Sequence, residues 1–180
     1  MNKNKRKILW ITRTALFIAL LIVLQAATAP LGNVLITGTV VNLLLIISVM
    51  TCGLASGLTV AVISPILAKF FGIGPFWVLI PFIAAGNIVL ILLWHFIGSR
   101  TANRKYAAYI TALISAAAAK FFVLYFGIVR IAIPLLLGLP EKQAAVISQM
   151  FSFTQLITAL AGGIIAVLIL PSLAKAIRVT

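Results

Sequence analysis

Residues 106–128 form a largely apolar segment that is long enough to cross a lipid bilayer, yet it carries a lysine at position 120. A helix rises about 1.5 Å per residue, so Lys120 lies roughly 21 Å into a hydrocarbon layer about 30 Å thick. A lone charge at that depth costs about 2.5–3.5 kcal/mol on insertion scales, and such residues face a protein interior or a wet cavity. We therefore expect this helix to be central and Lys120 to face a cavity. The alternative is that Lys120 extends to the lipid headgroups.

The composition places the chain among integral membrane proteins, because 64% of its residues are hydrophobic and its mean hydropathy is +1.28. The single cysteine, Cys52, excludes an internal disulfide and a multi-cysteine metal site. Fourteen Lys and Arg residues against one acid, Glu141, give a formal charge of +13. These charges lie mainly at the ends of apolar segments, which suits anionic lipid headgroups better than nucleic acid.

The apolar segments predict an all-α integral membrane protein with a single bundle of six transmembrane helices. The spans are expected at about 8–29, 39–52, 54–71, 76–98, 106–128 and 143–170. Gly/Pro-containing connections are expected at 30–38 and 129–142. Residues 1–7 would be a basic cytoplasmic tail without structure of its own, 8–171 the membrane domain, and 172–180 a second cytoplasmic tail.

The positive charges indicate which side of the membrane holds the termini. Nine basic residues fall at one face of the predicted bundle: Lys3, Lys5, Arg6, Lys7, Arg100, Arg104, Lys105, Lys175 and Arg178. Three fall at the other: Lys69, Arg130 and Lys142. Lys and Arg are in excess on the cytoplasmic side of membrane proteins, so this distribution predicts that the N-terminus and the C-terminus are both inside.

Polar side chains gather in the outer half of the predicted spans, with Asn87 near the midplane. The others are Gln25, Asn33, Thr37, Thr39, Asn42, Ser64, Lys69, Lys120, Tyr125, Gln149, Ser152 and Gln155. On the sixth span Ser148, Ser152 and Gln155 follow helical spacing, which predicts one inward-facing stripe. Such a set predicts a pocket that is open to the outside and closed below. The alternative is that these groups only join helices, at about 0.6 kcal/mol per hydrogen bond.

The sequence lacks the residues with which a membrane protein powers transport or performs catalysis. There is no carboxylate within the spans for proton or sodium coupling, and no G-x-x-x-x-G-K-[ST] motif for ATP. There is also no metal-binding motif and no acidic pair. We therefore expect a solute-binding protein, not an enzyme, that has no cofactor of its own and takes its energy from a partner. The alternative function is a small membrane scaffold or assembly subunit with no small-molecule ligand.

Six short spans, cytoplasmic termini, a basic leader and the stretch A-L-F-I-A at 15–19 resemble the substrate-binding S component of energy-coupling factor (ECF) transporters. The resemblance covers essentially the whole chain. It implies a multi-pass, bacterial-type cell-membrane protein that captures a vitamin or similar micronutrient from outside. It also implies partners, namely a transmembrane coupling subunit and two ATPase subunits, which use the ATP while the S component topples in the membrane to release its cargo.

Carried over to this chain, the resemblance implies that Ala15 and Ala19 form the face that docks on the partner, and that residues 30–38 form an outer lid. It places Asn87, Lys120, Ser152 and Gln155 in the lining of the pocket. With Asn42, Tyr125 and Gln149 from the outer polar set, these are the expected solute-binding residues. Lys120 favours a solute with a carboxylate or a phosphate, because a buried ammonium favours an anionic partner. No motif identifies the solute.

Overall fold

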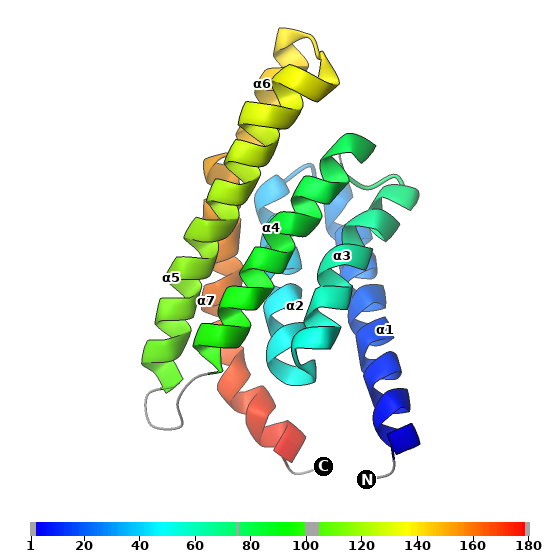
Figure 1. Ribbon diagram of the computed structural model, residues 1–180, viewed down its shortest axis with the longest axis vertical. Helices are drawn as coiled ribbons and strands as arrows, with labels where there is room; N and C mark the ends of the chain where they lie inside the picture. The colour runs from blue at the N-terminus through cyan, green and yellow to red at the C-terminus, as the bar shows by residue number, and fades with distance from the viewer. Residues whose placement is uncertain (1–2, 75, 100–104, 179–180) are drawn as a thin grey trace.

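The computed structural model of the protein describes residues 3–74, 76–99 and 105–178, and every regular element in these ranges is a helix (Figure 1). The α-helices are α1 (Lys3–Thr28), α2 (Val34–Cys52), α3 (Leu54–Phe70), α4 (Ile80–Leu93), α5 (Lys105–Leu124), α6 (Glu141–Met150) and α7 (Phe153–Arg178). Two 3-10 helices, η1 (Ala29–Leu31) and η2 (Trp77–Leu79), and two π-helices, η3 (Trp94–Gly98) and η4 (Tyr125–Leu137), complete the described chain.

Five helical stretches are long and apolar enough to cross a membrane, which confirms a multi-pass architecture. They are Lys3–Leu31, Val34–Cys52, Trp77–Gly98, Tyr106–Leu137 and Glu141–Leu173. The remaining apolar helix, α3, has 17 residues and is shorter than the length usually needed to cross. The sixth span and the orientation in the membrane therefore stay predictions.

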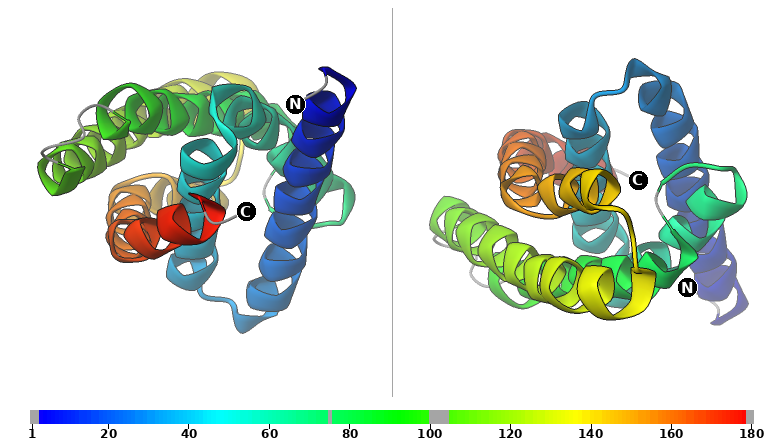
Figure 2. Two further views of the ribbon diagram at one scale, coloured as in Figure 1. Left: turned by 90° about the horizontal axis from the view of Figure 1, so that it is seen from below. Right: turned by 90° about the horizontal axis from the view of Figure 1, so that it is seen from above.

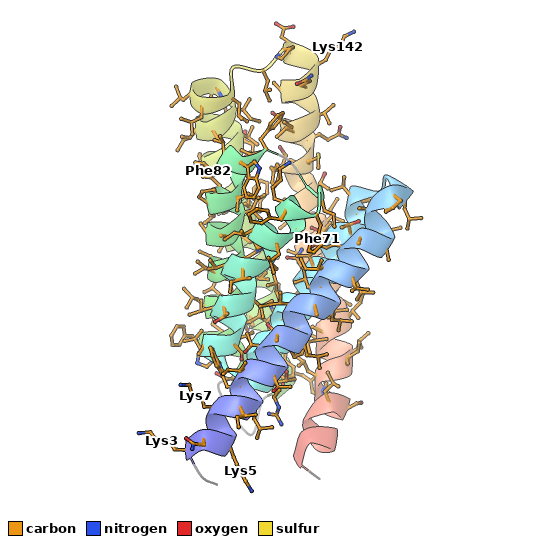
Figure 3. The ribbon with its side chains drawn as sticks, turned by 90° about the vertical axis from the view of Figure 1, so that its right-hand side faces the viewer. Lys3, Lys5, Lys7, Phe71, Phe82 and Lys142 are labelled. Carbon is orange, nitrogen blue, oxygen red and sulfur yellow. The ribbon has the colours of Figure 1, made fainter. Side chains whose placement is uncertain are left out.

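Both termini lie at one end of the bundle, and the hairpin of η4 and α6 projects at the opposite end (Figure 1). Lys3, Lys5 and Lys7 lie at the end with the termini, whereas Lys142 lies at the far end (Figure 3). This separation agrees with the predicted distribution of charge. The predicted loop residues Arg100 and Arg104 lie outside the described residues.

The central helix of the bundle is α2 and not the lysine-bearing α5. Helix α2 packs against α1, α3, α4, η3 and α7, whereas α5 packs against α4, α7 and the two π-helices. Viewed along the bundle, α5 lies at its edge (Figure 2). The expectation of a central α5 was wrong, because one buried face is enough to shelter a lysine: Ala112 and Ala116 on that face are fully buried.

Several predicted boundaries were also wrong, because helices extend into segments that were expected to be tails or loops. Helix α1 begins at Lys3, so the segment predicted as an unstructured tail is helical. Helix α2 begins at Val34 inside the predicted loop, where the Asn33 side chain caps it by accepting a hydrogen bond from Leu35 N at 3.0 Å. The predicted connection at 129–142 is helical to Leu137, since a π-helix accommodates Pro134.

The predicted sixth span is broken at residues 151–152, between α6 and α7. The carbonyls at the end of α6 accept hydrogen bonds from side chains: Thr154 Oγ1 donates to Gln149 O at 2.8 Å and Gln155 Nε2 donates to Met150 O at 3.1 Å. Side chains that compete for backbone groups in this way end a helix. The prediction of a continuous polar stripe through Ser148, Ser152 and Gln155 is therefore wrong.

Candidate functional site

A cavity of about 290 Å³ opens at the end of the bundle opposite the termini. Its rim includes the exposed residues Ala29, Gly32 and Asn33, and its floor includes the buried side chains of Asn42, Asn87 and Lys120. Asn33 and Asn42 are both on or next to α2, nine residues apart, so the cavity reaches roughly 13 Å along that helix. Its volume is near the lower end of the range, about 300–1,000 Å³, for pockets that hold small ligands.

The walls of the cavity are mostly apolar and come from most of the helices that meet at this end. Helix α2 supplies Val34 and Val41, α4 supplies Ile83, and α5 supplies Leu124. Phe151, in the break between α6 and α7, completes this group. Apolar walls with a few polar groups are typical of pockets for small molecules.

Lys120 is 3% exposed and donates hydrogen bonds to two amides: to Asn42 Oδ1 at 2.6 Å and to Asn87 Oδ1 at 2.8 Å. The lysine therefore faces the protein interior beside a cavity, as predicted, and does not extend to the headgroups. The short distances are those expected of charge-assisted hydrogen bonds.

The two amides are held in one orientation by partners of their own. Asn42 Nδ2 donates to Thr158 Oγ1 at 3.3 Å, and Thr158 Oγ1 donates in turn to Gln155 O at 3.1 Å. Asn87 Nδ2 donates to Ala61 O at 3.4 Å. Because both NH₂ groups are directed away, both amide oxygens face Lys120. We call these residues (Lys120, Asn42, Asn87 and Thr158) the lysine network.

Close contact between α2 and α7 makes the lysine network possible. A Cβ added at Gly162 would lie 2.7 Å from Thr39 O and 2.9 Å from Asn42 Cβ, and one added at Gly38 would lie 2.8 Å from Thr158 Cγ2. Only glycine permits this approach, and it brings Thr158 within reach of Asn42.

Within the described residues, Lys120 has no carboxylate partner. The only acidic residue, Glu141, is exposed in the first turn of α6. An ammonium group has three N–H donors, and the two amide oxygens take two of them. In its ammonium form Lys120 thus has one donor to spare and a positive charge that no carboxylate balances.

Gln25 is a second residue of the site whose hydrogen-bonding capacity is not fully used. It lies near the end of α1 and lines the cavity, and its Oε1 is buried without a hydrogen-bond partner. A buried polar atom without a partner costs about 1–3 kcal/mol, so its retention calls for an explanation. The sequence placed Gln25 in the outer polar half but gave no reason to select it, and it likewise did not select Thr158.

The structure brings four of the seven predicted solute-binding residues together at this cavity: Asn42, Asn87, Lys120 and Gln155. The other three lie elsewhere. Tyr125 stacks on Phe121 and lies under the Arg130 guanidinium, 5.3 Å from its ring centre. Gln149 lines an adjoining surface hollow and not the cavity itself, and the Ser152 hydroxyl donates to Ser148 O. The helix break at 151–152 explains why Ser152 and Gln149 do not join the others.

The predicted docking residues Ala15 and Ala19 are exposed in the middle of α1. Their role stays a prediction. Below the cavity, the bundle is filled by fully buried apolar side chains, among them Leu45, Ile46 and Trp94. In the described part of the chain, no group of His, Cys, Asp and Glu side chains is placed to hold a metal ion.

No curated protein and no solved structure matches the chain. A family model described as ECF transporter, substrate-specific component, matches residues 10–174, which is nearly the whole sequence. The chain therefore belongs to the family of substrate-specific components of ECF transporters.

Proposed function

We propose that this protein captures a vitamin or similar micronutrient from outside the cell and passes it to a coupling subunit that separate ATPases power. Membership of the family makes the chain a transport subunit, not an enzyme, that associates with a transmembrane coupling component and ATPases. The capture of a small solute is supported chiefly by one observation. The cavity has a buried lysine at its floor whose charge this chain does not balance.

The proposed solute is an anion. A buried charge is costly unless it is paired, and no carboxylate of the protein approaches Lys120. A carboxylate or phosphate of the solute would supply the counter-charge and accept the free N–H. The solute would thus be retained by a pairing that does not exist in the empty protein.

The proposed orientation has six spans with both termini in the cytoplasm of a bacterial-type cell. The excess of basic residues near the termini supports it. In this orientation the cavity opens to the outside, because the end of α1 and the start of α2, which line it, lie away from the termini (Figure 1). Residues 29–33, at the rim, would act as the lid, and Ala15 and Ala19 would contact the coupling subunit through the exposed face of α1.

The test is a comparison of matched lysine variants. The protein is purified in detergent from cells grown in rich medium, and small molecules released by heat are identified by mass spectrometry. We expect the wild type and Lys142→Met, which alters an exposed lysine outside the cavity, to release the same anion, and Lys120→Met to release at least tenfold less. Equal release from Lys120→Met would contradict the proposed site.

The alternative, a scaffold subunit without a ligand, requires an outer half that is filled and in which every polar group has a partner. The cavity and the unpaired Gln25 Oε1 argue against that packing. A protein that releases no small molecule, and that is not stabilised by any vitamin in a thermal-unfolding screen, would favour the scaffold.

A further inference from the structure

We propose that the solute of this cavity is a monocarboxylate, and not a phosphate ester, whose carboxylate lies against Lys120 and whose opposite end donates an N–H or O–H to Gln25. This inference rests on the proposed function, because it names the class of anion that the same cavity takes. It is carried by the direction of each hydrogen bond at the floor and by the partnerless acceptor near the rim.

The floor of the cavity offers an anion one charged donor. The NH₂ groups of Asn42 and Asn87 each donate one N–H, to Thr158 Oγ1 and to Ala61 O, and they are directed away from the ammonium. Their oxygens face inward beside the ammonium. An anion placed there therefore receives one N–H of Lys120 and lies close to two amide oxygens.

A phosphate ester matches this floor poorly. It carries a charge of about −1.5 to −2 and three strong acceptor oxygens at neutral pH. With one ammonium as the only cationic group that the described residues place there, up to about half of its charge would be buried without a counter-charge, next to the amide oxygens of the lysine network. A carboxylate carries one negative charge, which the single ammonium balances.

The rest of the cavity also limits the solute to one charge. Lys120 is the only ionisable side chain among the described residues that line it. Most of the wall is apolar, and a second charged group on the solute would lie against Val41, Ile83 or Leu124 with no counter-charge. The volume of about 290 Å³ further favours a compact acid over a nucleotide-sized one.

Gln25 specifies the chemistry of the other end. Its Oε1 is buried, has no partner and belongs to the cavity wall on α1, near the exposed rim residues Ala29 and Gly32. An amide or hydroxyl group of the solute would satisfy this acceptor, whereas an apolar end would leave it unpaired. We therefore expect the cavity to bind the acidic end of the solute at its floor and a hydrogen-bond donor of the solute near its rim.

The experiment measures thermal stabilisation of the purified wild-type protein by a panel of small solutes. The panel contains pantothenate and biotin, which are carboxylates with an O–H or N–H at the other end, and nicotinate and lipoate, which are carboxylates without one. It also contains their primary amides or alcohols and the phosphates pyridoxal 5′-phosphate and inorganic phosphate. It is accompanied by mass spectrometry of the small molecules that co-purify. We expect a carboxylate, in the panel or among the released compounds, to bind about 10- to 100-fold more tightly than its uncharged amide.

Each outcome decides between the two proposals. A phosphate ester, a cation or a neutral solute as the bound compound overturns this inference and leaves the transport function standing. A protein that binds nothing overturns both. Because these comparisons use the wild-type protein, they do not depend on whether a Lys120 variant folds.

Two variants of Gln25 test the second contact. Gln25→Leu removes the acceptor and is expected to weaken binding of the carboxylate about tenfold, while Gln25→Glu adds a negative charge and should weaken it further. Gln143→Leu, outside the cavity on the exposed surface of α6, is the matched control and should bind as the wild type does. Unchanged affinity in Gln25→Leu overturns the contact.

Discussion

The two ends of the bundle treat buried polar groups differently. Near the turn between α2 and α3, the hydroxyls of Thr14 and Ser56 form a hydrogen bond of 2.5 Å, and the Thr14 hydroxyl also donates to Trp10 O at 2.7 Å. These groups are satisfied within the protein and lie beside a packed apolar core. At the cavity end, Lys120 keeps one N–H donor that no described protein group accepts, and Gln25 Oε1 receives no hydrogen bond. Both residues line the cavity. Polar groups that only join helices have all their hydrogen bonds within the protein, and we call them closed. Polar groups that bind a ligand keep a donor or an acceptor free for it, and we call them incomplete.

The largest expected effect comes from replacing the lysine network by apolar side chains. Lys120→Met alone leaves two buried amide oxygens without partners and should cost about 2–3 kcal/mol of stability. The triple variant Lys120→Met/Asn42→Leu/Asn87→Leu removes both sides of each contact, so its stability should return to within about 1 kcal/mol of the wild type. Thermal unfolding in detergent measures stability, and solute release should be absent in both variants. A triple variant that still binds would show that the network is structural.

Assembly with the coupling subunit should depend on the exposed face of α1 outside the cavity. Ala15→Trp and Ala19→Trp place a large side chain on the exposed face of α1 and should reduce co-purification of the partner at least tenfold, since small residues allow close helix contact. Solute binding should be unchanged. Leu16→Trp is the control, because Leu16 is a large exposed residue one position away on the same helix. Equal loss in the control would remove the docking role from the two alanines.

Replacing a glycine of α7 by alanine should disturb the contact between α2 and α7 at Gly162 and have a smaller effect at Gly163. Gly162→Ala would drive a Cβ against backbone atoms of α2, 2.7 Å from Thr39 O, and should cost about 1–3 kcal/mol and weaken solute binding by displacing Asn42. At Gly163 the added Cβ meets the Leu113 side chain, which can rotate away. Unfolding midpoints and solute affinity should therefore change less in Gly163→Ala. An equal change in both variants would contradict this account of the contact.

The sequence was sufficient for the class of fold and for the residue at the centre of the site. Hydropathy identified the apolar helices, and the cost of a charge in lipid required Lys120 to face inward. Asn42 and Asn87 could be selected by depth, because amides are rare in apolar spans. These inferences depend on residue type and position along one helix, which the sequence contains.

Other features depend on how helices pack against each other, and the sequence does not contain that information directly. Ser152 and Gln149 followed helical spacing with Gln155, but the break at 151–152, where side chains bond the last carbonyls of α6, rotates them away. Thr158 and Gln25 became part of the site only through contacts with distant helices. The central position of α2 likewise follows from packing and not from any polar residue that it carries.

The smallest expected effect concerns the closed hydroxyl pair of Thr14 and Ser56. Thr14→Val keeps the shape of the side chain and removes one hydroxyl, so it should cost only about 0.6 kcal/mol, the average for a hydrogen bond between membrane helices. Because this pair lies far from the cavity, solute affinity should not change. The double variant with Ser56→Ala should cost little more than either single change, since both sides of one contact are then removed. A marked loss of solute binding in Thr14→Val would mean that the two ends of the bundle are coupled, and the contrast between closed and incomplete polar groups would then fail as a guide to the site.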